Sequence, residues 1–273
     1  MDSPARPTPS DSAPPAPADA RPRVGSVVQA MTILRYLGSR ETPQGVTAIA
    51  HALGISPSSC FNILKTLVDE DLVTFDAKSK YYTLGLGALE LARMALKHDP
   101  LLTLAQEPMR RLAEHWQAAC GLWRVSVRDR LVLAALAESG AATRIHMLVG
   151  QRQPLTAGAT GRVVMAARDL DDAAIANLIQ HARWARPPSV EDYRAQLAKV
   201  RAQGWALDTD QTFQGITTVA AAVADKQGVV RFCLSLTMFS GQYDSLTLNK
   251  IGQDVAQRAE QLALAAYGER LVP

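Results

Sequence analysis

Along the first hundred positions, apolar residues recur at the three- and four-residue spacing of amphipathic helices. The first predicted helix follows Ser26, a candidate N-cap, and ends at Gly38. Its apolar positions are Val27, Val28, Met31, Ile33, Leu34 and Leu37. The turn residues of 42–45, Thr-Pro-Gln-Gly, then predict a loop.

Two more helices are predicted directly after this loop. Residues 47–53 form a short helix, with Thr47 as its cap and Gly54 as the left-handed residue that ends it. The next helix follows Ser56 and runs to about Glu70, and its inward positions are Cys60, Ile63, Leu64, Leu67 and Val68. A short helix, a glycine-bearing turn and a second helix form a helix-turn-helix.

Two strand-like segments come next. Residues 72–75 and 81–84 flank a polar, basic tip at 76–80, a pattern that predicts a β-hairpin. A hairpin after a helix-turn-helix makes a winged helix, which we predict over residues 23–84. A small helical bundle with an incidental hairpin is the alternative, but the order, lengths and caps all favour the winged helix.

Residues 85–98 predict an apolar-rich helix, which Asp99-Pro100 ends because a residue before proline avoids helical geometry. We interpret it as a linker between domains. Its apolar stripe either pairs with a partner chain's copy or packs on its own domain. The remainder, 99–273, combines helices and local hairpins without regular βαβ repeats, which predicts an α+β chain whose second domain is mixed α/β.

In this second domain, the predicted helices are 101–119, 161–168, 171–181, 189–203 and 245–267. The predicted strands are 122–127, 131–137, 143–149, 205–208, 217–224 and 229–237. Residues 128–130 and 225–228 are predicted hairpin turns, and residues 150–161 are predicted as a loop that opens the helix at 161.

Composition changes this picture at the N-terminus. Residues 1–22 hold seven of the fifteen prolines and few large apolar groups, so we predict a disordered tail. The chain has no run of 18 apolar residues, so no membrane-spanning helix is predicted. The first residues also lack the apolar segment of a secretory signal. The three cysteines lie far apart, which predicts neither disulfides nor a zinc site and suits the cytoplasm. The formal net charge of +3 permits DNA binding where positive charge is local.

The order of these motifs resembles the isocitrate lyase regulator (IclR) type of bacterial transcription factor. The resemblance rests on segments such as VGSVVQAMTILRYL, VTAIAHALGISPSSCFNILKTLVDEDLVTFD and GQRQPLTAGATGRVVMAA. It implies a winged helix-turn-helix, a linker helix and a C-terminal domain similar to GAF and PAS sensors. It also implies a dimer or tetramer that binds an operator in double-stranded DNA and senses a small carboxylic or aromatic acid.

Some positions depart from the family's pattern. Asn62 stands where the third helix usually carries an arginine, and Gln211 where a glutamate is usual. Thr218 stands where the family usually has cysteine, serine or alanine.

The outward positions of the third helix and the basic wing are candidate DNA contacts. Serine and asparagine can hydrogen-bond to base edges, phenylalanine can touch a thymine methyl, and lysines neutralise phosphates. The predicted residues are Pro57, Ser58, Ser59, Phe61, Asn62, Lys65, Lys78 and Lys80. The alternatives are that Phe61 belongs to the core, that the two serines only cap the helix, and that Lys65 is simply solvated.

A second candidate site is an effector pocket. The backbone N–H groups of Ala159, Thr160 and Gly161 open a helix, where an anion such as a carboxylate is favoured. The alternative there is a tight turn without a ligand. The resemblance adds Asp208, Thr218, Val219, Ser235 and Thr237, of which Ser235 and Thr237 share a strand face. Met147, Val149 and Leu155 are candidate apolar walls, although Met147 could equally be core; these walls favour an acid with an apolar body.

Two other function classes compete. Cys233, His146 and Asp208 could in principle form a cysteine-dependent hydrolase site, but no catalytic signature surrounds Cys233. The second competing class is a ligand-binding adaptor without sequence-specific DNA binding. We therefore expect a regulator rather than an enzyme, with no cofactor, no metal and no membrane partner.

Overall fold

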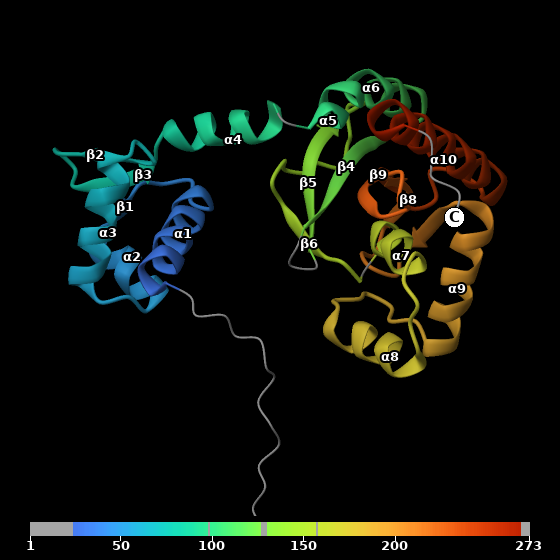
Figure 1. The fold of residues 1–273 in the computed structure, drawn as a ribbon, viewed down its shortest axis with the longest axis horizontal. Coiled ribbons are helices and arrows are strands. Elements are labelled where there is room, and N and C mark those ends of the chain that lie inside the picture. Colours follow the sequence, from blue (N-terminus) through green and yellow to red (C-terminus); the bar gives the residue numbers. More distant parts are fainter. Residues whose placement is uncertain (1–23, 98, 127–129, 157, 269–273) are drawn as a thin grey trace, which may run out of the picture. The chain divides into compact units, whose positions relative to one another are not determined.

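The structure is a computed structural model that describes residues 24–97, 99–126, 130–156 and 158–268 (Figure 1). The predicted tail at 1–22, and Arg128 and Asp129 of the predicted turn at 128–130, lie outside these residues. The chain divides into two compact units, Met1–Leu96 and Lys97–Pro273.

The first unit is a winged helix, as predicted. Its three helices precede a hairpin, and a two-residue strand joins the hairpin's inner strand to give the sheet order β1-β3-β2. The elements are α1 (Gly25–Gly38), β1 (Gln44–Gly45), α2 (Val46–Leu53), α3 (Pro57–Asp69), β2 (Val73–Asp76), β3 (Tyr81–Leu84) and α4 (Gly87–Lys97). The residues at 42–45 were predicted as a loop, and β1 arises from pairing with β3, a contact that no local pattern signals.

The helix ends in this unit follow local chemistry, with two corrections. Gly54 takes a left-handed conformation after α2, and Ser56 caps α3 by accepting a hydrogen bond from the Ser59 N–H, both as predicted. The Ser26 cap is wrong, because the cap position belongs to Val24 and α1 begins two residues earlier than predicted, at Gly25. The Thr47 cap is also wrong, because the cap position belongs to Gly45.

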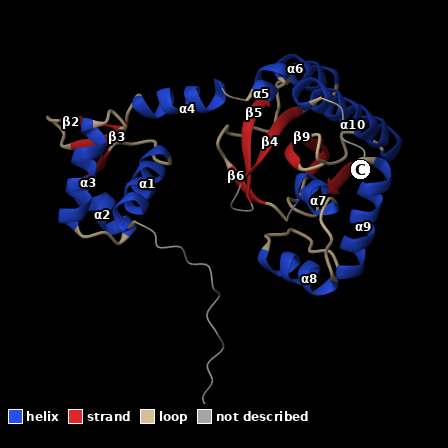
Figure 2. Cartoon of the chain, viewed as in Figure 1, coloured by secondary structure: helices blue, strands red, loops and turns tan. Residues whose placement is uncertain are grey.

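The second unit is built on one six-stranded antiparallel sheet, coloured red in Figure 2. The strand order is β6-β5-β4-β9-β8-β7. The strands are β4 (Ala119–Ser126), β5 (Arg130–Ala137), β6 (Arg152–Pro154), β7 (Trp205–Thr209), β8 (Ile216–Ala224) and β9 (Val230–Phe239). The helices are α5 (Pro100–Leu104), α6 (Gln106–His115), α7 (Gly158–Ala166), α8 (Asp172–His181), α9 (Val190–Gln203) and α10 (Ser245–Tyr267).

Each face of this sheet has its own core. On one face, alternate residues such as Leu122, Val219 and Leu236 pack in one cluster with α5, α6 and α10. On the other face, residues such as Trp123, Ala220 and Cys233 pack with α7 and α9. We call these the α10 face and the α7 face. Because strand side chains alternate, neighbouring residues of β8 and β9 belong to different faces.

Two sequence predictions fail in this unit. The single helix at 101–119 is two helices, α5 and α6, and its last residue is already in β4. The strand at 143–149 does not form, and the edge strand is instead β6 at Arg152–Pro154, within the predicted loop. Short apolar runs do not reveal which of them finds a strand partner.

Candidate DNA-binding and effector sites

Helix α3 presents the predicted DNA-contacting residues to solvent. Pro57, Ser58, Ser59, Asn62 and Lys65 are all exposed. The buried stripe of Cys60, Leu64 and Leu67 lies on the opposite side and holds the helix against α1 and α2. A helix with one face in the core and a polar face outside is suited to enter a major groove.

Two alternatives for α3 can now be decided. Phe61 is 51% exposed, so it is not a core residue. Ser56 rather than Ser58 or Ser59 caps the helix, and its hydroxyl lies 3.3 Å and 2.8 Å from theirs. The two following serines therefore remain at the exposed start of α3, where their DNA contacts stay a prediction.

The wing carries its lysines on a turn that Asp76 organises, a role that the sequence reading missed. The Asp76 carboxylate accepts hydrogen bonds from the Lys78 N–H and the Ser79 hydroxyl, each at 2.8 Å. These bonds, the first above all, lower the pKa of Asp76. Lys80 has a left-handed backbone (φ 61°), and its ammonium lies 5.8 Å from the Phe75 ring centre. Both wing lysines are exposed.

In the second unit, three predicted effector residues form one row across the α7 face. Cross-strand pairing places Asp208 beside Thr218, and Thr218 beside Thr237. The two threonine hydroxyl oxygens are 3.4 Å apart. The prediction that Val219 belongs to the same site is wrong. Val219 is fully buried in the cluster on the α10 face and so points away from this row.

Ser235 lies on the same face but its hydroxyl is already engaged. It accepts a hydrogen bond from the Trp123 indole N–H at 3.0 Å and lies 3.4 Å from the Gly121 carbonyl oxygen. A Cβ on Gly121 would lie 2.8 Å from that indole nitrogen, so glycine leaves the space that Trp123 fills. The indole thus covers the sheet beside Ser235.

The start of α7 is packed against the protein itself. Ala159 and Thr160 are buried, and the Thr160 carbonyl oxygen lies 3.7 Å from the Cys233 sulfur. Gly158 needs its positive φ of 75°, and a Cβ on Gly161 would lie 2.8 Å from the Leu155 carbonyl oxygen. These glycines therefore serve a tight turn and a close approach of the chain's own backbone.

Val149, one of the three predicted apolar walls, is 60% exposed. The other two, Met147 and Leu155, are buried in the α7-face core. Both are less than a tenth exposed. This burial fits the plain-core alternative for Met147.

Asp208 belongs to a buried polar cluster that the sequence reading did not find. Arg162, which is fully buried, donates to the Asp208 carboxylate at 2.8 Å, to Gln196 at 2.6 Å and to Gln211. The Thr212 hydroxyl also donates to Asp208, at 2.8 Å. A lone arginine in an apolar helix was the available signal, because a buried charge needs a partner.

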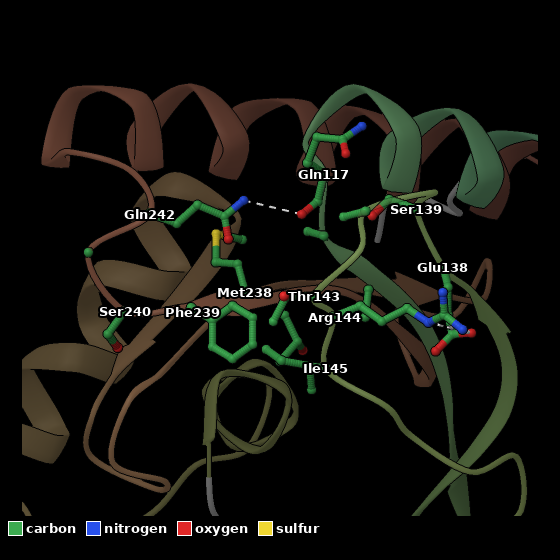
Figure 3. Close-up of a pocket in the computed structure, with 15 residues that line it drawn as sticks. Gln117, Glu138, Ser139, Thr143, Arg144, Ile145, Met238, Phe239, Ser240 and Gln242 are labelled. Atoms are coloured by element: carbon green, nitrogen blue, oxygen red, sulfur yellow. Dashed lines mark hydrogen bonds and ion pairs between the residues drawn. The ribbon is translucent and has the colours of Figure 1, made fainter.

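An open pocket of about 450 Å³ lies beside this row (Figure 3). Of the predicted effector residues, Thr237 alone lines it among the residues that the structure describes. Its other lining residues come from the start of β4, from the loop after β5 and from the end of β9. They are Gln117, Ala118, Ala119, Glu138, Ser139, Ala141, Thr143, Arg144, Ile145, Met238, Phe239, Ser240, Gly241 and Gln242.

The residues of the hydrolase alternative do not form a catalytic set. Burial raises the pKa of the Cys233 thiol, which lies against a backbone carbonyl. Asp208 pairs with Arg162, and the exposed His146 lies 3.3 Å from Glu138. A nucleophile requires an accessible, activated thiol beside a base.

Comparison with known proteins identifies both units. Residues 26–77 match the IclR helix-turn-helix domain, and residues 93–264 match the bacterial transcriptional regulator IclR C-terminal family. The chain is 28% identical over 219 residues to the transcriptional regulator KdgR of Dickeya chrysanthemi, covering 78% of this chain and 70% of KdgR. It is 25% identical over 249 residues to XynR of Escherichia coli, covering 89% and 98%.

A solved structure agrees with this assignment. An IclR transcriptional regulator from Alicyclobacillus acidocaldarius superposes with a TM-score of 0.77 at 26% identity, over 89% of this chain and 99% of that one. These proteins are transcriptional regulators rather than enzymes. No helix in the described part of the chain is long and apolar enough to cross a membrane. The protein belongs to the IclR family of DNA-binding bacterial transcriptional regulators, with a C-terminal ligand-binding domain.

Proposed function

We propose that this regulator responds to a small organic acid with an apolar body. The observation that carries this proposal is the pocket in Figure 3. Ile145 and Phe239 offer apolar surface, while Thr143 and Thr237 offer hydroxyl groups, and its volume of about 450 Å³ suits a short-chain or aromatic acid.

The predicted effector residues enter this proposal unequally. Thr237 lines the pocket, and Thr218 and Asp208 continue its row on the sheet. The Ser235 hydroxyl already accepts from the Trp123 indole, and residues 159–161 are buried, so both would contribute less than this row. Val219, on the other face, would act only through packing.

For DNA recognition we propose that Ser58, Ser59 and Asn62 contact base edges, with Phe61 against a thymine methyl. Lys65, Lys78 and Lys80 would neutralise phosphates, and Pro57 would set the entry of α3. Exposure of the whole set supports this division of roles. Because the operator would be chromosomal, we expect the protein to act in the cytoplasm.

We also propose that residues 23–84 bind the operator, that 85–98 link the domains and that 99–273 bind the effector, with the chain acting as a dimer or tetramer. Two apolar stripes in the first unit support association. Val24, Val27, Val28 and Met31 in and directly before α1 are exposed, as are Leu86, Leu89, Leu91 and Met94 in and beside α4. Exposed stripes of this kind mark contact surfaces.

The experiment is a gel shift on the DNA upstream of the protein's own gene, with and without acids that raise its melting temperature. We expect a retarded complex whose affinity changes in the presence of a stabilising acid. A chain that binds acids but never this DNA would instead be the adaptor. DNA binding that no acid alters would refute the proposed effector class.

A further inference from the structure

The rim of the pocket in Figure 3 holds an arginine whose hydrogen-bonding groups the protein does not use. The Nε atom of Arg144 lies 3.7 Å from the Glu138 carboxylate, an ion pair without hydrogen-bond contact. Within the described residues, no acceptor hydrogen-bonds to this guanidinium. Its five N–H donors are thus available to a ligand.

Glu138 is shared between two partners. Besides Arg144, its carboxylate lies 3.3 Å from the Nδ1 atom of His146. The arginine side chain is 52% exposed and the glutamate 27%. An ion pair between side chains this exposed is weak, so a second carboxylate can compete for the arginine.

The rest of the pocket is neutral. Of its fifteen lining residues, Glu138 and Arg144 alone carry a formal charge. The other polar groups that line it are hydroxyls, amides and backbone groups. An acid whose apolar body lies against Ile145 and Phe239 therefore has one cation within the pocket lining, and that cation stands at the rim.

The predicted anion position at the start of α7 is less exposed than Arg144. Ala159 and Thr160 are buried, and a Cβ on Gly161 would meet the backbone of Leu155 and Thr156. The Arg144 side chain, by contrast, is 52% exposed.

From these observations we infer that Arg144 is the carboxylate anchor of the effector pocket and that Glu138 competes with the effector for it. The inference rests on the proposed function, since it needs an acid as the effector. Arginine suits this role because its planar fork binds a carboxylate through two parallel hydrogen bonds. The Glu138 carboxylate lies beside the Arg144 guanidinium, and the carboxylate of the bound acid takes the place of Glu138.

Opposite effects of two neutral substitutions test this inference. The probes are benzoate and 3-methylbutanoate, each compared with its primary amide, and binding to the full-length protein is followed by calorimetry. Arg144→Gln should weaken binding of the acids by roughly three- to tenfold. Glu138→Gln should strengthen it, because the competing carboxylate is gone. Binding of the amides should change little in either variant.

Arg152→Gln is the matched control, because it removes the same charge from an exposed position of this domain outside the pocket lining. It should leave acid binding unchanged. Both pocket variants should keep the wild-type melting temperature without ligand, since neither side chain is buried.

The outcomes separate this inference from the proposed function. If the acids bind Arg144→Gln as tightly as wild type, or bind Glu138→Gln more weakly, the anchor lies elsewhere while the acid-responsive regulator stands. If Arg152→Gln weakens acid binding as much as Arg144→Gln does, the effect comes from the overall positive charge of the domain and the inference fails. If neither acid binds the wild type, for these probes the proposed effector class and this inference fail together.

Discussion

Arg162 and Asp208 show how one buried charge organises its surroundings. The guanidinium has hydrogen-bond acceptors on α9, on β7 and on the segment after β7, and lies 5.7 Å and 5.9 Å from the ring centres of Trp184 and Tyr193. Asp208 also accepts from the backbone N–H groups of Gln211 and Thr212. Such a cluster is stabilising only while every member keeps its partner.

Asp208→Asn should therefore destabilise the effector domain strongly. The change keeps the side-chain shape but leaves Arg162 buried with a neutral partner, and breaking a buried pair costs about 3–5 kcal/mol. Denaturant unfolding measures the effect. Arg162→Met together with Asp208→Asn should cost less than the sum of the two single changes. A single variant within about 1 kcal/mol of wild type would show that the pair contributes little.

Ser235→Ala should act first on stability. The substitution leaves the buried Trp123 N–H without its acceptor, which costs about 1–3 kcal/mol. Tryptophan emission should change in the wild-type background but not in Trp123→Phe, which provides the control. If stability and emission stay unchanged while acid binding is lost, Ser235 contacts the effector directly, as the sequence suggested.

Asn62→Ala and Lys80→Ala should separate base contacts from phosphate contacts. Loss of the Asn62 side chain should alter which operator base is preferred. Loss of the Lys80 side chain should weaken binding to all DNA sequences alike and reduce the slope of log affinity against log salt concentration by about 1. Lys199→Ala, an exposed lysine of α9, is the control for net charge. Titrations against operator variants at several salt concentrations give both quantities. If Asn62→Ala weakened binding to all operator variants equally, Asn62 would have no role in recognising a base.

At the scale of elements, the α10 layer of the effector domain depends on a close approach to the sheet. Helix α10 crosses β8 and β7, and Gly252 makes that approach possible. A Cβ built there would lie 2.3 Å from the indole of Trp205, itself almost fully buried. Glycine is required at this position by the helix–sheet distance rather than by its backbone angles.

Gly252→Ala should accordingly destabilise the domain by about 1–3 kcal/mol, because the added methyl forces the helix or Trp205 to move. In an open helix the same change would stabilise, since alanine favours helix. Gln253→Ala, one residue on and exposed, should have little effect. Thermal unfolding distinguishes the two. An unchanged melting temperature for Gly252→Ala would mean that α10 tolerates a larger separation from the sheet.

For the whole molecule, the division after Leu96 suggests that each unit carries its own core. The winged helix packs around Ile33, Ile49 and Leu64, and the second unit around the two faces of its sheet. Units with separate cores can be expected to fold separately.

A fragment of residues 99–273 should therefore fold cooperatively and stay oligomeric. Limited proteolysis of the full chain should release it, and light scattering should report its mass. Its acid affinity should equal that of the full chain, because the pocket lies entirely within it. A monomeric fragment with loosely packed side chains would contradict this prediction.

The sequence by itself determined the features that depend on neighbours in the chain. The Ser56 cap, the left-handed Gly54 and the turn at 225–228 could be predicted because a few adjacent residues decide their geometry, although the caps at Ser26 and Thr47 were not found. Alternation also placed Ser235 and Thr237 on one face of β9. The winged helix followed, since its helices and hairpin are consecutive.

Only the tertiary structure decided what depends on distant partners. The Arg162–Asp208 pair joins residues 46 apart in sequence, and Trp123 meets Ser235 across 112 residues. The same holds for β1 and β6, which are strands only because another strand lies beside them. Local patterns carry no record of such contacts. A local pattern proposed the start of α7 as an anion site and the resemblance added Val219, whereas packing buries the α7 turn and turns Val219 to the opposite face of the sheet.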